Sequence, residues 1–141
     1  MLQQTPVGRV LPAWVSWMRA WPSPRALAAV PAGEALRAWG RLGYPRRAIR
    51  LHATAAIISD QHNGEVPSDY QSLLALPGIG TYTAAAIQSF AFGIPSVVLD
   101  VNVRRVISRA WSGQQLPKPH ITSVEKALAQ VLVNEAPDPI S

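Results

Sequence analysis

Thirteen prolines and nine glycines divide the chain into short segments. Some of these prolines directly follow a residue that favours helix capping, as in Thr5-Pro6 and Ser23-Pro24, an arrangement typical of a helix start. Between the breaks, apolar residues recur with helical spacing, and no segment shows the alternation expected of a strand. The sequence therefore predicts an all-α fold built from short helices.

The expected helices follow from these breaks. The first runs from Thr5-Pro6 to about residue 21, and its period of 3.6 predicts a single apolar face made of Val7, Val10, Leu11, Trp14, Val15 and Met18. Further helices are expected over 24–30, from Pro31 to a C-cap at Gly43, over 45–62, after a cap at Ser68, over 83–92 after a cap at Thr81, from Asp100 to 111, and over 122–135.

Composition narrows the functional classes. A chain of 141 residues with 48% hydrophobic residues can bury the core of one domain, expected over 1–141. It contains no cysteine, which excludes disulfides, thiol nucleophiles and thiolate-held metal or iron-sulfur centres within this chain, and its three histidines lack metal-ligand spacing, so no metal site is expected. A net charge of +5 permits a polyanionic partner without requiring one. No apolar run is long enough to span a membrane, so the expected location is the cytoplasm.

The segment LPGIGTYTAAAI at 76–87 contains the sharpest turn signal in the chain. Pro77 restricts one φ angle, and Gly78 and Gly80 permit backbone angles that other residues avoid, so a tight hairpin is expected over 76–82. Backbone N–H groups of this turn, and of a following helix capped by Thr81, would form a concavity that accepts a phosphate. An ordinary corner between two helices is the alternative interpretation.

Asp100 stands twenty residues after Gly80, at an expected helix start. Aspartate is a favoured N-cap, which explains the residue without any chemistry. A carboxylate near a phosphate-binding hairpin is also suited to stabilising positive charge that develops on a sugar. The two roles are compatible.

The hairpin LPGIG, the helix after it and the Asp in LDVNV resemble the helix-hairpin-helix DNA glycosylases, the superfamily of endonuclease III. Three further matches, MLQQT at 1–5, LGY at 42–44 and LPGIGTYTAAAI, resemble its MutY-type adenine glycosylases. The resemblance implies a helix-hairpin-helix glycosylase fold, here mainly the six-helix barrel domain and truncated at both ends.

The resemblance also implies residue roles. The MLQQT residues Gln3 and Gln4 and the tyrosine of LGY, Tyr44, would bind DNA, with Gln4 and Tyr44 pushed into the duplex while an adenine is rotated out. Without the resemblance, Gln4 and Tyr44 would be interpreted as a buried polar residue and a core aromatic. Asp100 would stabilise the sugar cation and Asn102 would help to organise the site. The expected hairpin contacts to DNA are Leu76, Gly78, Ile79, Gly80 and Thr81.

Position 82 separates two chemistries. Relatives that also cut the strand place a lysine there to form a Schiff base, whereas this chain has Tyr82, which would line the adenine pocket. The only lysines are Lys118 and Lys126, both outside the hairpin. The implied reaction is hydrolysis of the N-glycosidic bond, leaving an uncut strand. The arginines at 46, 47, 50, 104 and 105 are interpreted either as phosphate contacts or as a solvated basic face.

The family pattern is incomplete here. The resemblance places the general-acid glutamate two residues before Met1, and a four-cysteine [4Fe-4S] loop and a domain that recognises 8-oxoguanine after the residues present, so we expect a fragment with feeble excision. Two hypotheses remain. One is a bacterial, nucleoid-associated, monomeric glycosylase acting on double-stranded DNA with A:G or A:8-oxoguanine mispairs. The other is a non-catalytic helix-hairpin-helix module that binds the duplex backbone.

Overall fold

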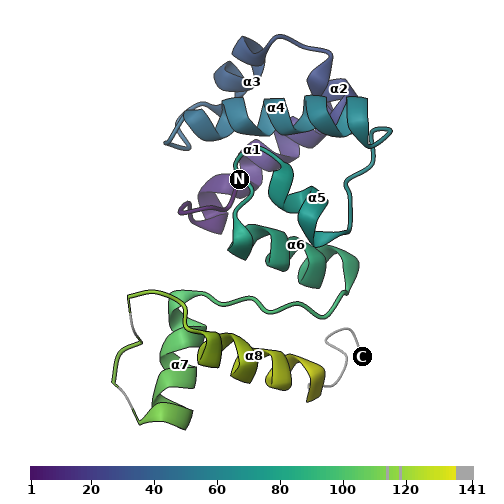
Figure 1. Ribbon diagram of the computed structural model, residues 1–141. Coiled ribbons are helices and arrows are strands. Elements are labelled where there is room, and N and C mark those ends of the chain that lie inside the picture. The colour runs from purple at the N-terminus through teal and green to yellow at the C-terminus, as the bar shows by residue number, and fades with distance from the viewer. Residues whose placement is uncertain (114, 118, 136–141) are drawn as a thin grey trace. The chain divides into compact units, whose positions relative to one another are not determined.

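The computed structural model describes residues 1–113, 115–117 and 119–135. Within these residues the chain forms eight α-helices and no strand, which confirms the all-α prediction (Figure 1). The helices are α1 (Val7–Ala20), α2 (Pro24–Ala28), α3 (Ala32–Trp39), α4 (Arg46–Gln61), α5 (Tyr70–Ala75), α6 (Thr81–Phe92), α7 (Val101–Ser112) and α8 (Ser123–Glu135).

The chain divides into two compact units. The first unit comprises Met1–Pro67 and Ala75–Gly78, and the second comprises Ser68–Leu74 and the chain from Ile79 onward. In the first unit α4 packs against α2 and α3, and α1 packs against α3 (Figure 1). In the second unit α7 packs against α8. The expectation of one domain over 1–141 stays a prediction.

The core of the first unit is built around two tryptophans. Trp17 of α1 and Trp39 of α3 are 5% and 2% exposed, and their rings meet edge to face at 5.8 Å. Edge-to-face contacts of this kind stabilise a core beyond the area that they bury. The other buried members of this cluster are Val10, Leu27, Ala35, Leu42, Ala48 and Ala55.

The apolar face predicted for α1 is mostly exposed. Val10 and Trp17 are buried and Ala13 packs against the core, whereas the residues left exposed are Val7, Leu11, Trp14 and Met18. Because α1 carries apolar residues on more than one side, periodicity alone did not decide which side packs against α3. The exposed stripe is the side that α3 does not cover.

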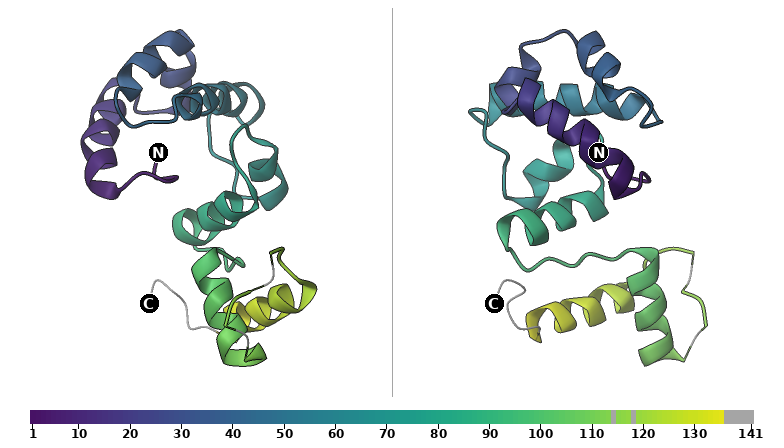
Figure 2. Two further views of the ribbon diagram at one scale, coloured as in Figure 1. Left: turned by 90° about the vertical axis from the view of Figure 1, so that its left-hand side faces the viewer. Right: turned by 180° about the vertical axis from the view of Figure 1, so that it is seen from behind.

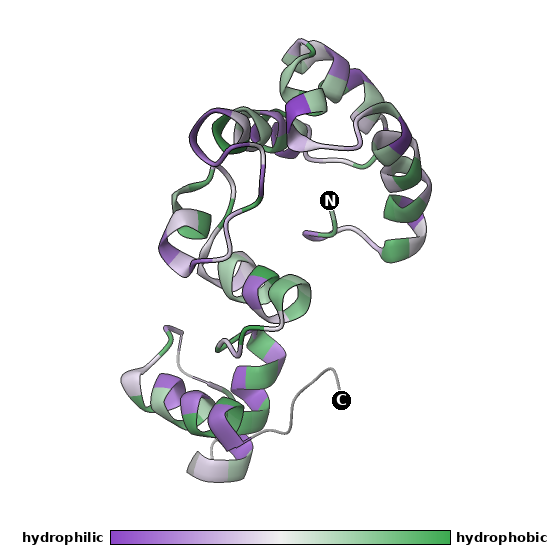
Figure 3. Ribbon diagram, turned by 90° about the vertical axis from the view of Figure 1, so that its right-hand side faces the viewer, coloured by the Kyte–Doolittle hydropathy of each residue, from purple (hydrophilic) through white to green (hydrophobic). Residues whose placement is uncertain are grey.

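The second unit contains α6, an extended link over 93–100, and the α7–α8 pair (Figure 2). The side-chain amide of Gln88 in α6 donates to the Ser68 carbonyl at 2.8 Å, and its oxygen accepts from the Ser96 hydroxyl at 2.9 Å. Gln88 therefore ties two segments to α6: the segment before α5, through Ser68, and the extended link after α6, through Ser96. Both α7 and α8 carry hydrophobic and hydrophilic residues, as expected of helices with one buried side (Figure 3).

Two predicted helix ends are corrected. The α3 helix ends at Gly40, with φ of 57°, rather than at Gly43, because the chain already turns left-handed one turn earlier. The cap before α5 is Asp69, whose carboxylate accepts from the Ser72 N–H at 2.9 Å, rather than Ser68. Ser23 caps α2 as predicted, accepting from the Ala26 N–H.

Candidate functional site

The predicted hairpin begins with a turn that is attached to the first unit. The Pro77 carbonyl accepts from the Thr54 hydroxyl at 2.8 Å, and the Gly78 carbonyl accepts from the Gln3 side chain at 3.3 Å. The MLQQT segment therefore contacts the turn directly, although 75 residues separate Gln3 from Gly78. Leu76 is only 4% exposed, so its side chain anchors the turn and its backbone alone is left for a DNA contact.

The two hairpin glycines differ in backbone conformation and in surroundings. Gly78 has a φ of +81°, and a Cβ there would lie 3.1 Å from the Arg50 side chain, so both its backbone and its surroundings favour glycine. The expectation that Gly80 needs unusual angles is wrong: its φ is −98° and its backbone is extended, a conformation open to any residue. Gly80 is exposed, and an added Cβ would meet no atom within 4 Å.

Thr81 does not cap α6. It is the first residue of the helix, Gly80 is the N-cap, and no side-chain cap hydrogen bond is present. The first bond of the helix ladder runs from the Ala84 N–H to the Gly80 carbonyl at 2.9 Å, so the N–H groups of Thr81 and Tyr82 precede that ladder. The hairpin thus ends in an uncapped helix N-terminus, which suits an anion. Contact with DNA by Ile79, Gly80 and Thr81 stays a prediction.

Tyr82 lies in the first turn of α6 and is 49% exposed. Its side chain is therefore available to a substrate. Neither lysine of the chain belongs to this turn in sequence. Lys126 lies in α8, and Lys118 lies outside the described residues.

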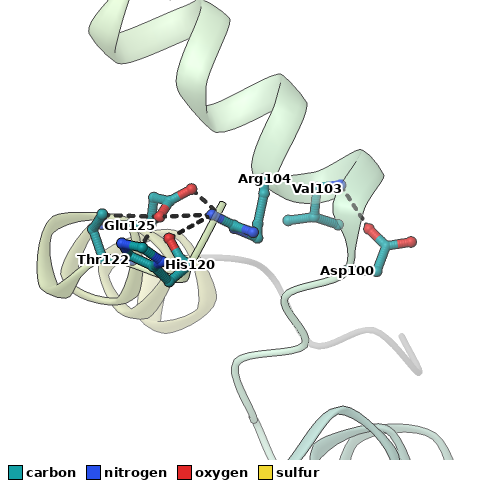
Figure 4. Close-up of polar contacts among 6 residues, drawn as sticks. All are labelled: Asp100, Val103, Arg104, His120, Thr122 and Glu125. Carbon is teal, nitrogen blue, oxygen red and sulfur yellow. Dashed lines mark hydrogen bonds and ion pairs between the residues drawn. The ribbon is translucent and has the colours of Figure 1, made fainter. Parts of the chain in front are cut away.

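Asp100 caps α7, as the sequence predicts. One carboxylate oxygen accepts from the Val103 N–H at 2.7 Å, and the other accepts from the Asn102 side-chain amide at 3.4 Å (Figure 4). The helix N-terminus and the amide together orient the carboxylate. Asp100 is half-buried and Asn102 is exposed. Asn102 thus contacts Asp100, and its role in organising the site stays a prediction.

Behind Asp100, a buried ion pair joins α7 to α8. Arg104 Nε donates to Glu125 Oε1 at 3.0 Å, and Arg104 Nη2 donates to the His120 carbonyl at 2.8 Å (Figure 4). Glu125 also forms a capping box with Thr122, accepting from its N–H at 2.7 Å while the Thr122 hydroxyl accepts from the Glu125 N–H at 3.2 Å. The alternatives considered for Arg104, a phosphate contact or a solvated face, are both wrong.

These contacts determine the charge of Glu125. Burial by itself raises the pKa of this carboxyl, but hydrogen bonds from the Arg104 side chain and from the backbone and side chain of Thr122 outweigh it and lower the pKa to about 2. Glu125 is therefore ionised at neutral pH and holds no proton for acid catalysis. The Thr-x-x-Glu spacing is a sequence signal for the capping box, whereas no local pattern indicates the partner Arg104.

Gln4 and Tyr44 share an uncommon backbone conformation. They have φ values of 56° and 49°, and among the described residues the only other non-glycine residue with positive φ is Asn63. Each such conformation costs about 1 kcal/mol for a residue with a side chain. Gln4 is exposed and Tyr44 is 63% exposed, so Tyr44 is not a core aromatic and Gln4 is not a buried polar residue. Strain of this kind marks candidate functional positions.

No group of three or more His, Cys, Asp or Glu side chains among the described residues is placed to hold a metal ion. The whole sequence lacks cysteine, so these residues do not fit a [4Fe-4S] cluster. None of the described helices has the length and apolar character needed to cross a bilayer.

Comparisons with known proteins agree with this geometry. Residues 1–132 match the family model described as HhH-GPD superfamily base excision DNA repair protein. The chain is 53% identical over 114 residues to the adenine DNA glycosylase of Mycobacterium tuberculosis, covering 81% of this chain and 38% of that protein. It is 38% identical over 138 residues to the human adenine DNA glycosylase, covering 96% of this chain and 25% of that protein. The chain thus spans well under half the length of these relatives.

Solved structures show the same fold. A thermostable thymine-DNA glycosylase aligns with a TM-score of 0.80 and 27% identity, covering 98% of this chain and 63% of that one. A trapped endonuclease III–DNA covalent intermediate aligns with a TM-score of 0.76 and 28% identity, covering 97% of this chain and 62% of that one. These matches confirm the helix-hairpin-helix fold, and the second relative was solved bound to DNA.

Proposed function

Because this chain belongs to the HhH-GPD superfamily of base excision DNA repair proteins, we propose that its residues serve in a monofunctional adenine DNA glycosylase. The proposed reaction is hydrolysis of the N-glycosidic bond of an adenine mispaired with guanine or 8-oxoguanine in double-stranded DNA. The choice of adenine rests on the 53% identity to an adenine DNA glycosylase.

The observation that carries the proposal is the arrangement at Asp100. Its carboxylate is oriented by the Val103 N–H and the Asn102 amide, so it is a fixed negative charge at a helix start. When the glycosidic bond breaks, adenine takes the bonding electrons and positive charge develops on the sugar. A preorganised carboxylate stabilises that charge until water adds to C1′ and loses a proton.

Tyr82 supports hydrolysis over strand cleavage. Its phenol is not an amine and cannot form a Schiff base with the opened sugar. It is 49% exposed in the first turn of α6, where it can contact an extruded base. The product of the proposed reaction is therefore an abasic site in an intact strand.

Loss of adenine also needs a proton on the base. Among the described carboxyls, Glu125 does not supply it, because its pKa of about 2 leaves it ionised. The adenine glycosylase pattern assigns this step to a glutamate that precedes the MLQQT motif. Excision without that proton donor is slow, since general acid catalysis contributes about 10²–10⁴-fold.

The test is excision from a labelled duplex with adenine opposite 8-oxoguanine, followed by alkali to break abasic sites. We expect slow breaks above the background of Asp100→Asn, and no breaks without alkali. Tyr82→Lys should add a covalent complex that borohydride traps, because the new amine can form a Schiff base that hydride reduces. Equal background for the unaltered chain and Asp100→Asn, together with salt-sensitive duplex binding by both, would instead support the non-catalytic module.

A further inference from the structure

One guanidinium in the first turn of α4 contacts both segments that contain the left-handed residues. Arg47 Nη1 donates to the Gln3 carbonyl and, at 3.3 Å, to the Met1 carbonyl. Arg47 Nη2 donates to the Thr5 hydroxyl at 2.7 Å and to the Gly43 carbonyl at 3.2 Å. The residues on both sides of Gln4, and the residue before Tyr44, are thus bound to the same side chain.

The same group also holds Tyr44 directly. The guanidinium carbon lies 5.2 Å from the centre of the Tyr44 ring and 5.3 Å from that of Trp39. The Arg47 backbone N–H donates to the Tyr44 carbonyl at 2.9 Å. Because Trp39 is 2% exposed and its Nε1 donates to the Gly43 carbonyl at 2.9 Å, the guanidinium and the Tyr44 loop rest on a rigid part of the core.

We propose that Arg47 is a positioning residue that presents Gln4 and Tyr44 as one rigid pair for insertion into the duplex. This inference rests on the proposed function, in which these two side chains enter the DNA as the adenine leaves it. Arg47 itself need not touch the DNA, because its guanidinium bonds to backbone and side-chain oxygens of the protein and lies over two of its aromatic rings. Its role is to maintain two strained backbone conformations before DNA binds, so that binding does not have to order them.

Only arginine suits this position. Its planar fork donates in several fixed directions while its face lies against aromatic rings. A lysine keeps the positive charge but presents one compact ammonium, which cannot reach the Gln3 and Gly43 carbonyls in the same way while covering both rings. Arg47→Lys should therefore release the pair without changing the net charge that attracts DNA.

Other contacts should keep the unit folded in such a variant. The Thr5 hydroxyl donates to the Leu42 carbonyl at 3.5 Å, the Gln3 side chain donates to the Gly78 carbonyl at 3.3 Å, and the tryptophan core does not include Arg47. The change should thus separate loop positioning from folding.

The experiment uses the full chain and a duplex in which 2-aminopurine replaces the target adenine opposite 8-oxoguanine. Its fluorescence rises when the base leaves the stack, and anisotropy of an end label measures binding separately. At saturating protein we expect Arg47→Lys to lose most of the fluorescence rise, about fivefold or more, while its Kd changes less than about threefold. Arg19→Lys, an exposed change of the same type in α1, should leave both readouts unchanged.

A second variant covers the case in which Arg47→Lys does not fold. Thr5→Val keeps the shape of a buried side chain but removes the hydroxyl that Arg47 contacts at 2.7 Å, and it should reduce the fluorescence rise partially. A full fluorescence rise in a folded Arg47→Lys, or in Thr5→Val when Arg47→Lys does not fold, overturns the inference about Arg47 alone. If the unaltered chain binds the duplex by anisotropy but causes no rise in 2-aminopurine fluorescence, the duplex insertion in the proposed function is overturned. The inference about Arg47 is then overturned with it.

Discussion

The Arg104 guanidinium of α7 and the Glu125 carboxylate of α8 form an ion pair at 3.0 Å with both side chains only 10% exposed. The pair lies one helical turn after Asp100, and the Arg104 N–H donates to the Asp100 carbonyl at 3.0 Å. The contact that joins the two helices is therefore also adjacent to the residue proposed to stabilise the sugar cation.

Removing one partner of this pair should destabilise the fold strongly. Arg104→Met leaves Glu125 charged and buried without its counter-charge, and Glu125→Gln leaves the buried guanidinium without its counter-charge, so each should lower the free energy of unfolding by about 3 kcal/mol. Urea unfolding followed by circular dichroism measures this change. Gln130→Ala, at an exposed position in α8, is the control and should change stability by less than about 0.5 kcal/mol. A loss below 1 kcal/mol in both pair variants would contradict the prediction.

The same pair makes stability dependent on acid pH. The pKa of Glu125 is about 2 in the folded chain, below its ordinary value of 4.5, so the folded state binds its proton less readily than the unfolded state. The resulting stabilisation, about 3 kcal/mol from about 1.4 kcal/mol per pH unit, is present above pH 4.5 and is lost as the pH falls toward 2. Unfolding of the unaltered chain and Glu125→Gln across this range should show a steeper loss for the unaltered chain. Parallel pH profiles would disagree with this account.

Two substitutions at Asp100 should separate capping from chemistry. Asp100→Asn keeps an oxygen that accepts from the Val103 N–H and removes the charge, so excision should fall to background with little change in stability. Asp100→Ala loses the cap as well and should cost about 1 kcal/mol more. Ser23→Ala is the control, because it removes a cap from α2 at similar cost and should leave excision intact. Excision by Asp100→Asn at the rate of the unaltered chain would refute the role of the charge.

The two hairpin glycines should respond differently to alanine. Gly78→Ala places a Cβ at positive φ and 3.1 Å from Arg50, so we expect a loss of about 1–2 kcal/mol in stability. Gly80→Ala meets no neighbour and has an ordinary φ, so stability should be unchanged. If a DNA strand approaches this backbone closely, Gly80→Ala should nevertheless weaken duplex binding in an anisotropy titration. Unchanged affinity would place the strand elsewhere.

Local signals in the sequence predicted much of the framework, because they depend only on neighbouring residues. Ser23 and Asp100 are caps as predicted, and Gly78 has the left-handed conformation expected of a turn glycine. The family motifs likewise identify Gln4 and Tyr44 as candidates. Their roles in DNA binding stay predictions.

Tertiary packing alone decided the rest. The side of α1 that faces α3, the pairing of Arg104 with Glu125, and the bonds from Arg47 to the MLQQT segment all involve partners more than ten residues away. The positive φ of Gln4 and Tyr44 belongs to the same class, because no local preference of glutamine or tyrosine produces it. A sequence records which side chains are available, whereas their geometry follows from which surfaces are buried together when the chain folds.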